Sequence, residues 1–236
     1  MTRGDADGLV RLTPGGSAQT APLGAVILVQ LWRSLPGLLC ANLLFLAWCA
    51  PYGLFALLGL PALALAVLPL TVGPGLVALV TAAARVAKGQ PIGGWSAGLR
   101  DARTGFATGA VFATGFLLCW HAQLVALRVV VEQQGAAGAV VLWAAQVAVL
   151  ALGALVGVHA LALVGLYGQG ALEATRNAFV LAMRHPGPTV ATLGLVVIAS
   201  LLTWSLAGAP LIILPAALAL VVVTSTQRLV DGGGST

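Results

Sequence analysis

Four long stretches of this chain contain no Asp, Glu, Lys or Arg, and this feature constrains the fold more than any other. The stretches run over residues 34–84, 104–127, 133–172 and 185–227. A helix crosses the hydrocarbon core of a bilayer with about 20 apolar residues, so each stretch is long enough to span a membrane. Charged residues form only 7% of the 236-residue chain, whereas soluble domains are about one quarter charged. The sequence therefore predicts an integral membrane protein built from α-helices.

The lengths of these stretches predict six crossings. The first stretch is too short for three helices with their loops and holds two, and the last divides at Gly208-Ala209-Pro210. The predicted fold is an all-α polytopic bundle in one domain, residues 31–228, with transmembrane helices at about 35–57, 60–86, 105–127, 137–166, 189–207 and 210–227. Residues 1–30 are expected to be a polar segment, flexible or interfacial, and residues 229–236 a flexible tail.

The positions of Lys and Arg predict the orientation of the chain. Cytoplasmic loops of membrane proteins carry an excess of these residues. With six crossings, ten of the eleven basic residues fall on one side of the membrane, and only Arg128 falls on the other. Both termini are then cytoplasmic, and the expected location is the inner (cytoplasmic) membrane. The net charge of +5 is explained by orientation in the lipid bilayer, so no nucleic-acid partner is expected.

Two cytoplasmic connections are predicted to be amphipathic helices. In the first, one face carries four apolar residues: Trp95, Leu99, Ala102 and Phe106. In the second, residues 171–184, one flank carries Leu172, Phe179 and Met183. Either helix could be a docking surface for a partner or for lipid headgroups, or a simple connector that lies in the membrane interface.

The second predicted helix contains Pro69 and Pro74, with glycines beside Pro74. Prolines at this spacing interrupt the hydrogen bonds of a helix. One interpretation is a kink whose loose backbone groups are satisfied by neighbouring helices. The other is a broken helix that aims free N–H groups at a solute or ion, as in secondary transporters. The candidate contacts in that case are Thr71, Gly73, Pro74 and Gly75.

Polar side chains inside the spans are expected to form contacts between helices, because unpaired polar groups are costly in hydrocarbon. They are Asn42, His121, Gln123, Gln146 and His159. His121 lies about 24 Å along a helix that enters from the cytoplasm, and His159 about 33 Å along one that enters from outside. The two histidines should therefore lie in different leaflets, where they cannot share a metal ion or haem. No metal and no cofactor is predicted.

Helix contacts and a surface ion pair can also be predicted. The motifs Gly105-xxx-Gly109 and Gly153-xxx-Gly157 suit close helix approach, either within the chain or between copies of it. The sequence leaves that choice and the oligomeric state open. Arg128 and Glu132 are four residues apart just beyond the third span, which favours a local ion pair on the external surface.

Three stretches in this order resemble one group of membrane proteins. They are NLLFLAWCAP at residues 42–51, the segment 73–106 from GPGLVAL to RTGF, and NAFVLAMRHPGPT at residues 177–189. Together they resemble the YesL-like family, a domain-of-unknown-function group of small multi-span proteins, over residues 30–228. This chain has more residues between Pro51 and Gly73 than that family pattern. The resemblance implies a bacterial inner-membrane protein that accompanies carbohydrate-uptake ABC transporters and has no established catalytic residues.

The predicted function is that of a non-catalytic accessory or interaction subunit of a membrane system, with a membrane protein or transporter complex as its partner. An enzyme is not expected, because the predicted spans contain no Asp or Glu and the chain contains no HExxH, P-loop or comparable catalytic motif. The alternative is a small secondary transporter or channel that uses the Pro/Gly-rich segment of the second helix. No catalytic residue is predicted.

Overall fold

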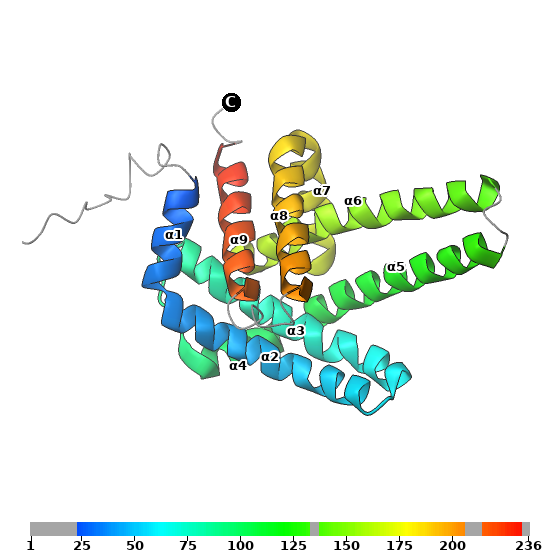
Figure 1. Ribbon diagram of the computed structural model, residues 1–236. Helices are drawn as coiled ribbons and strands as arrows, with labels where there is room; N and C mark the ends of the chain where they lie inside the picture. Colours follow the sequence, from blue (N-terminus) through cyan, green and yellow to red (C-terminus); the bar gives the residue numbers. More distant parts are fainter. Residues whose placement is uncertain (1–22, 133–136, 206–213, 233–236) are drawn as a thin grey trace, which may run out of the picture.

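The computed structural model describes residues 23–132, 137–205 and 214–232, which form helices joined by short connections without any strand (Figure 1). The helices are α1 (Leu23–Arg33), α2 (Leu35–Leu57), α3 (Pro61–Ala87), α4 (Gly94–Thr104), α5 (Phe106–Glu132), α6 (Ala137–Tyr167), α7 (Ala171–Arg184), α8 (Pro186–Ser205) and α9 (Leu214–Gly232).

Five of these helices, α2, α3, α5, α6 and α9, are long and apolar enough to cross a membrane. The chain is therefore a membrane-embedded helical protein. In α8, the residues Pro186–Ala199 form a shorter apolar helical segment. The sixth crossing, which the sequence analysis assigned to residues 189–207, and the orientation of the chain remain predictions.

The predicted boundaries agree closely with the observed helices at the centre of the chain and less well at its ends. The helix α2 spans the predicted residues 35–57, whereas α5 continues five residues past the predicted end at 127. Residues 23–33 form α1, although the sequence analysis assigned residues 1–30 to a polar segment, because LGAVILVQLWR is apolar enough to pack as a helix. The helix α9 extends into the predicted tail, to Gly232. The connection predicted at residues 208–210 lies outside the described residues.

The helix α3 lies at the centre of the structure and packs against α2, α4, α5, α6 and α9. The largest hydrophobic cluster joins α3 to its neighbours through buried side chains that include Leu38, Leu79, Ala83, Leu166, Leu220 and Val223. Small side chains on α3 let the other helices approach closely, which helps helices associate in membranes. Most of the buried side chains of α3 lie between Thr71 and Val86, in the half that is predicted to face the cytoplasm.

Glycines set the closest contact between α3 and α5. A Cβ atom on Gly73 would lie 2.3 Å from the carbonyl oxygen of Gly109. A Cβ atom on Gly105 would lie 2.3 Å from a methyl group of Val77. Gly105-xxx-Gly109 is therefore a packing face within the chain. The second motif differs, because an added Cβ on Gly153 or Gly157 would meet nothing within 4 Å.

The helices α5 and α6 form a long hairpin that extends away from the other helices (Figure 1). We call its outer part, residues 111–132 and 137–155, the arm. Of the described side chains in the arm, only that of Ala126 is buried. The arm therefore presents almost all of its surface to whatever surrounds the protein.

The helix α7 folds back along α6 through an alanine face. Ala174 and Ala178 are completely buried and pack in one cluster with Val156, Ala160 and Leu163 of α6. The apolar flank described from the sequence, Leu172, Phe179 and Met183, is exposed. Alanines, with minimal side chains, permit the closest approach of two helices, so they and not the larger residues face the bundle.

Candidate functional site

The connection between α3 and α4 forms a tight corner at the end of the bundle that is predicted to be cytoplasmic. The helix α3 ends at Ala87, and two residues later Gly89 has a φ of 68°, in the left-handed region that glycine adopts without strain. The N–H of Gln90 donates to the carbonyl oxygen of Arg85, which closes the last turn. The chain then passes Pro91 and enters α4 at Gly94.

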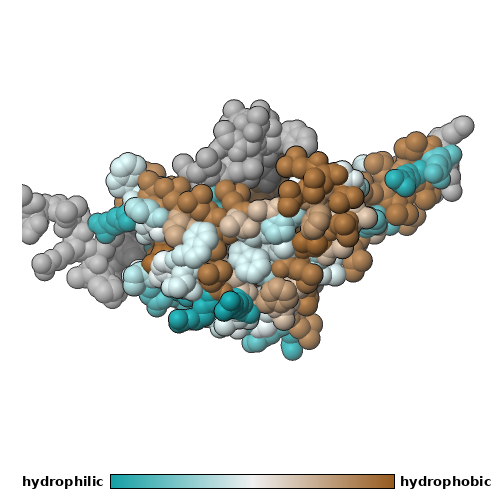
Figure 2. Space-filling model, turned by 90° about the horizontal axis from the view of Figure 1, so that it is seen from below, coloured by the Kyte–Doolittle hydropathy of each residue, from teal (hydrophilic) through white to brown (hydrophobic). Residues whose placement is uncertain are grey.

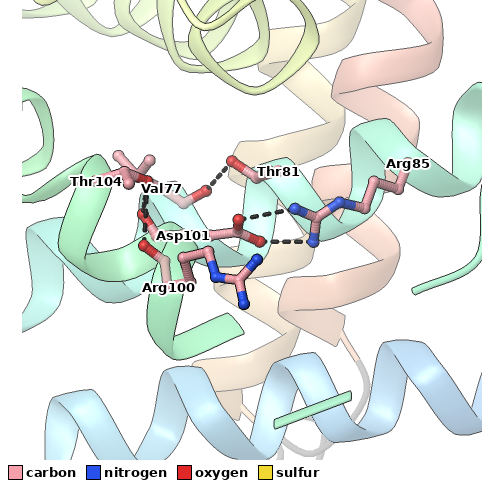
Figure 3. A network of polar contacts seen from close by, with 6 residues as sticks. All are labelled: Val77, Thr81, Arg85, Arg100, Asp101 and Thr104. Atoms are coloured by element: carbon pink, nitrogen blue, oxygen red, sulfur yellow. Dashed lines mark hydrogen bonds and ion pairs between the residues drawn. The ribbon is translucent and has the colours of Figure 1, made fainter. Parts of the chain in front are cut away.

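A two-pronged ion pair between Arg85 and Asp101 fastens α4 to α3 (Figure 3). The Arg85 Nη1 atom lies 2.6 Å from Oδ2 of Asp101, and Nη2 lies 2.7 Å from Oδ1. Paired guanidinium and carboxylate groups of this kind make short, strong and directional hydrogen bonds. The side chains are 27% and 11% exposed, so water screens them only in part. Sequence reasoning missed this pair, although Asp101 is the only acidic residue between Asp7 and Glu132.

The ion pair borders a small recess between α2, α3 and α4. Arg85, Asp101 and Trp95 line it, together with small residues such as Gly98. Its volume, counted as the space open to the centre of a water molecule, is about 10 Å³, which is enough for about one water molecule. The recess can hold a water against the charged pair but is far too small for an organic solute.

Lys88 links the end of α3 to the end of α6. Its Nζ donates a hydrogen bond to the carbonyl oxygen of Leu166 and lies 5.4 Å from the ring centroid of Tyr167. A cation is favoured at a helix C-terminus, where the last carbonyl groups lack partners, and over an aromatic face. Arg85 and Lys88 therefore hold α4 and α6 against α3, beyond any role in orienting the chain.

The segment Thr71–Gly75 differs from the broken helix that one interpretation required. The helix α3 runs without interruption from Pro61 to Ala87. The hydroxyl group of Thr71 donates to the carbonyl oxygen of Val67 at 3.0 Å, so it caps no new helix. Gly73, Pro74 and Gly75 are buried, and Gly73 faces the backbone of α5. The interpretation as a broken helix therefore does not match α3, and the other interpretation, in which neighbouring helices pack against this segment, agrees with the contact of Gly73 with α5. Contact of Thr71–Gly75 with a solute stays a prediction.

His159 forms a contact between helices in the interior. Its side chain is completely buried, and its Nδ1 atom lies 2.8 Å from the Thr226 hydroxyl oxygen of α9. That hydroxyl group donates its hydrogen to the carbonyl oxygen of Val222, so Nδ1 must carry the proton and donate. The Nε2 atom is buried and has no hydrogen bond among the described residues. The pair links α6 to α9.

The other polar residues of the spans lie in two different environments. Asn42 is completely buried in α2, whereas His121 is exposed on α5. Gln123 and Gln146 are half-buried, on the facing helices of the arm and equally far from its connection. His121 and His159 thus lie in different surroundings, one exposed and one buried, and a helix contact of His121 stays a prediction.

Two further expectations can be compared with the structure. The ion pair predicted between Arg128 and Glu132 is absent, because the only ion pair among the described residues is Arg85–Asp101. Both side chains are exposed, so surrounding water offers each an alternative partner at little cost. Within the described part of the chain, no three His, Cys, Asp or Glu side chains gather as metal ligands would.

No family model, curated protein or solved structure matches this chain. Similarity to a known protein therefore adds nothing to the geometry, and the resemblance to the YesL-like family remains a prediction.

Proposed function

We propose that this chain is a non-catalytic accessory subunit that docks a partner on its cytoplasmic side. The observation that carries the proposal is the fixed position of α4. The Arg85–Asp101 pair holds this amphipathic helix against α3, while Trp95 remains 48% exposed. Arg100 and Arg103 are exposed on the same helix. An exposed Trp and two exposed Arg side chains on one helix that is already ordered have the composition of a protein-binding surface.

The proposal includes six crossings, with both termini in the cytoplasm of a bacterial cell and the chain in the inner membrane. The distribution of Lys and Arg supports this orientation, since it places ten of eleven basic residues on one side. It also places α4 in the cytoplasm. The resemblance to the YesL-like family suggests that the partner is a membrane subunit of a carbohydrate-uptake ABC transporter.

The alternative function is transport by this chain itself, and it was suggested by a break in the second predicted helix. The helix α3 is continuous from Pro61 to Ala87, so no second helix begins at Thr71–Gly75. We therefore argue only for the accessory function.

Photo-cross-linking in cells tests the proposal. A photoreactive amino acid at position 95 should capture a protein partner, whereas the same group at Leu57, which is 89% exposed at the opposite end of α2, should not. Arg100→Glu should reduce capture without lowering the amount of the protein. Solute flux by the purified chain in liposomes, with no protein captured at position 95, would overturn the proposal.

A further inference from the structure

One face of α5 carries an exposed row of residues with the spacing of a coiled coil. Successive members are separated alternately by three and four residues, so that the pattern repeats every seven. We call this row the heptad stripe; it consists of Val111, Thr114, Leu118, His121, Val125, Arg128 and Glu132. All seven side chains are exposed, on the side of α5 opposite Gln123. This spacing is that of the contact seam between two helices that wrap around one another.

A second exposed face of α5 has a different composition and serves as an internal comparison. It carries only bulky apolar residues: Phe116, Trp120, Leu124, Leu127 and Val131. Such a face suits contact with lipid tails. Figure 2 shows the arm as mainly hydrophobic, with hydrophilic residues towards its outer end.

Lipid is a poor occupant for the heptad stripe. His121 lies seven residues inside Arg128, which is about 10 Å along the helix, and Thr114 lies the same distance further in. An ionisable side chain within a span almost always faces protein or a water-filled cavity, because its exposure to hydrocarbon is costly. The stripe therefore needs a partner that offers hydrogen bonds at two depths and apolar contacts between them.

We propose that the heptad stripe is the contact with a second copy of the chain, in a parallel dimer about a two-fold axis. Both copies enter the membrane in the same direction, so each residue of the stripe faces its own counterpart. A Thr hydroxyl group and a neutral imidazole each donate and accept hydrogen bonds, so Thr114 and His121 can pair with themselves. Leu118 forms the apolar layer between them, and Val111 and Val125 form the apolar layers on either side.

The charges at the end of the stripe fit the same symmetry. Arg128 and Glu132 form no ion pair with each other or with another residue in the described part of the chain. In a parallel dimer, Arg128 of one copy lies one layer, about 6 Å along the axis, from Glu132 of the second copy. The two-fold axis produces this pair twice. Each of these pairs offsets the like charges that face one another within the Arg128 layer and within the Glu132 layer. The stripe is thus complementary to itself in hydrogen bonding and in spacing, and between adjacent layers in charge; it requires no other protein and does not depend on the proposed function.

Cysteine cross-linking in native membranes tests the dimer. In a variant with Cys40, Cys49 and Cys119 replaced by Ala, single cysteines are introduced at Leu118 or Val125 of the stripe. Matched controls carry the cysteine at Leu124 or Leu127 of the apolar face. We expect oxidation to join two copies several-fold more at the stripe than at the control positions. Equal yields at all four positions, no dimer, or cross-links from the stripe to a different protein would overturn the proposal.

Exchanging the charges of Arg128 and Glu132 separates a loss of the dimer from a loss of folding. Arg128→Glu and Glu132→Arg, each in the Leu118→Cys background, should reduce the cross-linked fraction several-fold, because each places like charges in adjacent layers. The double variant restores the complementary pair and should restore the dimer. Failure of the double variant to recover, with its abundance unchanged, would contradict the predicted ion pairs and with them the parallel dimer.

Discussion

Gly73 and Gly109 touch backbone to backbone, and this contact sets the distance between α3 and α5. A Cβ atom on Gly73 would lie 2.3 Å from the carbonyl oxygen of Gly109, and one on Gly109 would lie 2.4 Å from that of Gly73. Neither carbonyl oxygen can move away without a shift of its helix. The contact also explains why a Pro/Gly-rich segment remains helical, because tight packing holds the backbone beside Pro74 in place.

Gly109→Ala is therefore expected to destabilise the protein. Added volume in a close-packed contact costs about 1–3 kcal/mol. Unfolding by a denaturing detergent in mixed micelles, followed by circular dichroism, measures the loss. The control is Gly153→Ala, where the new methyl group meets nothing within 4 Å and where Ala favours the helix by about 1 kcal/mol. Similar stability of the two variants would show that α3 and α5 do not meet at these glycines.

Asp101→Asn is expected to release α4 from α3. The substitution keeps the shape of the side chain but removes the charge that pairs with Arg85, at a cost of about 1–2 kcal/mol for a partly exposed pair. Hydrogen–deuterium exchange should accelerate in residues 94–104 and change little in α9. Glu173→Gln, which neutralises an exposed acid of α7, is the matched control. Unchanged exchange in α4 would mean that packing of Ala102 alone holds this helix.

Thr226→Val is expected to weaken the contact between α6 and α9. Valine fills the same volume but leaves the Nδ1–H of His159 without an acceptor. Hydrogen bonds between membrane helices contribute about 1–2 kcal/mol, and a loss of this size should appear in the same unfolding assay. Thr175→Val is the control, because that hydroxyl group is exposed and bonds only within α7. In a double-mutant cycle with His159→Leu, additive effects would show that the two residues do not interact.

The sequence alone predicted the long apolar helices, because their positions follow from composition. It missed the contacts between helices, because those depend on how the helices pack. Long uncharged stretches locate spans because hydrocarbon excludes charge, and α2 begins and ends at the predicted residues. The alanine face of α7 was missed, because an Ala in a sequence does not show which helix approaches it. The Arg85–Asp101 pair was missed for a similar reason: sixteen residues and a corner separate its partners, and only the fold brings them together.

The number of crossings can be decided by where the chain ends. If α8 crosses the membrane, a reporter fused after Gly232 should lie in the cytoplasm, like one placed after Gln90. If α8 does not cross, α9 runs the other way and the same fusion reads external. We expect the first result, since the second would move Arg228 to the side of Arg128 and weaken the bias of Lys and Arg that orients the chain. A reporter after Gln134 should read external in either case, so a cytoplasmic signal there would contradict the α5–α6 hairpin as a pair of crossings.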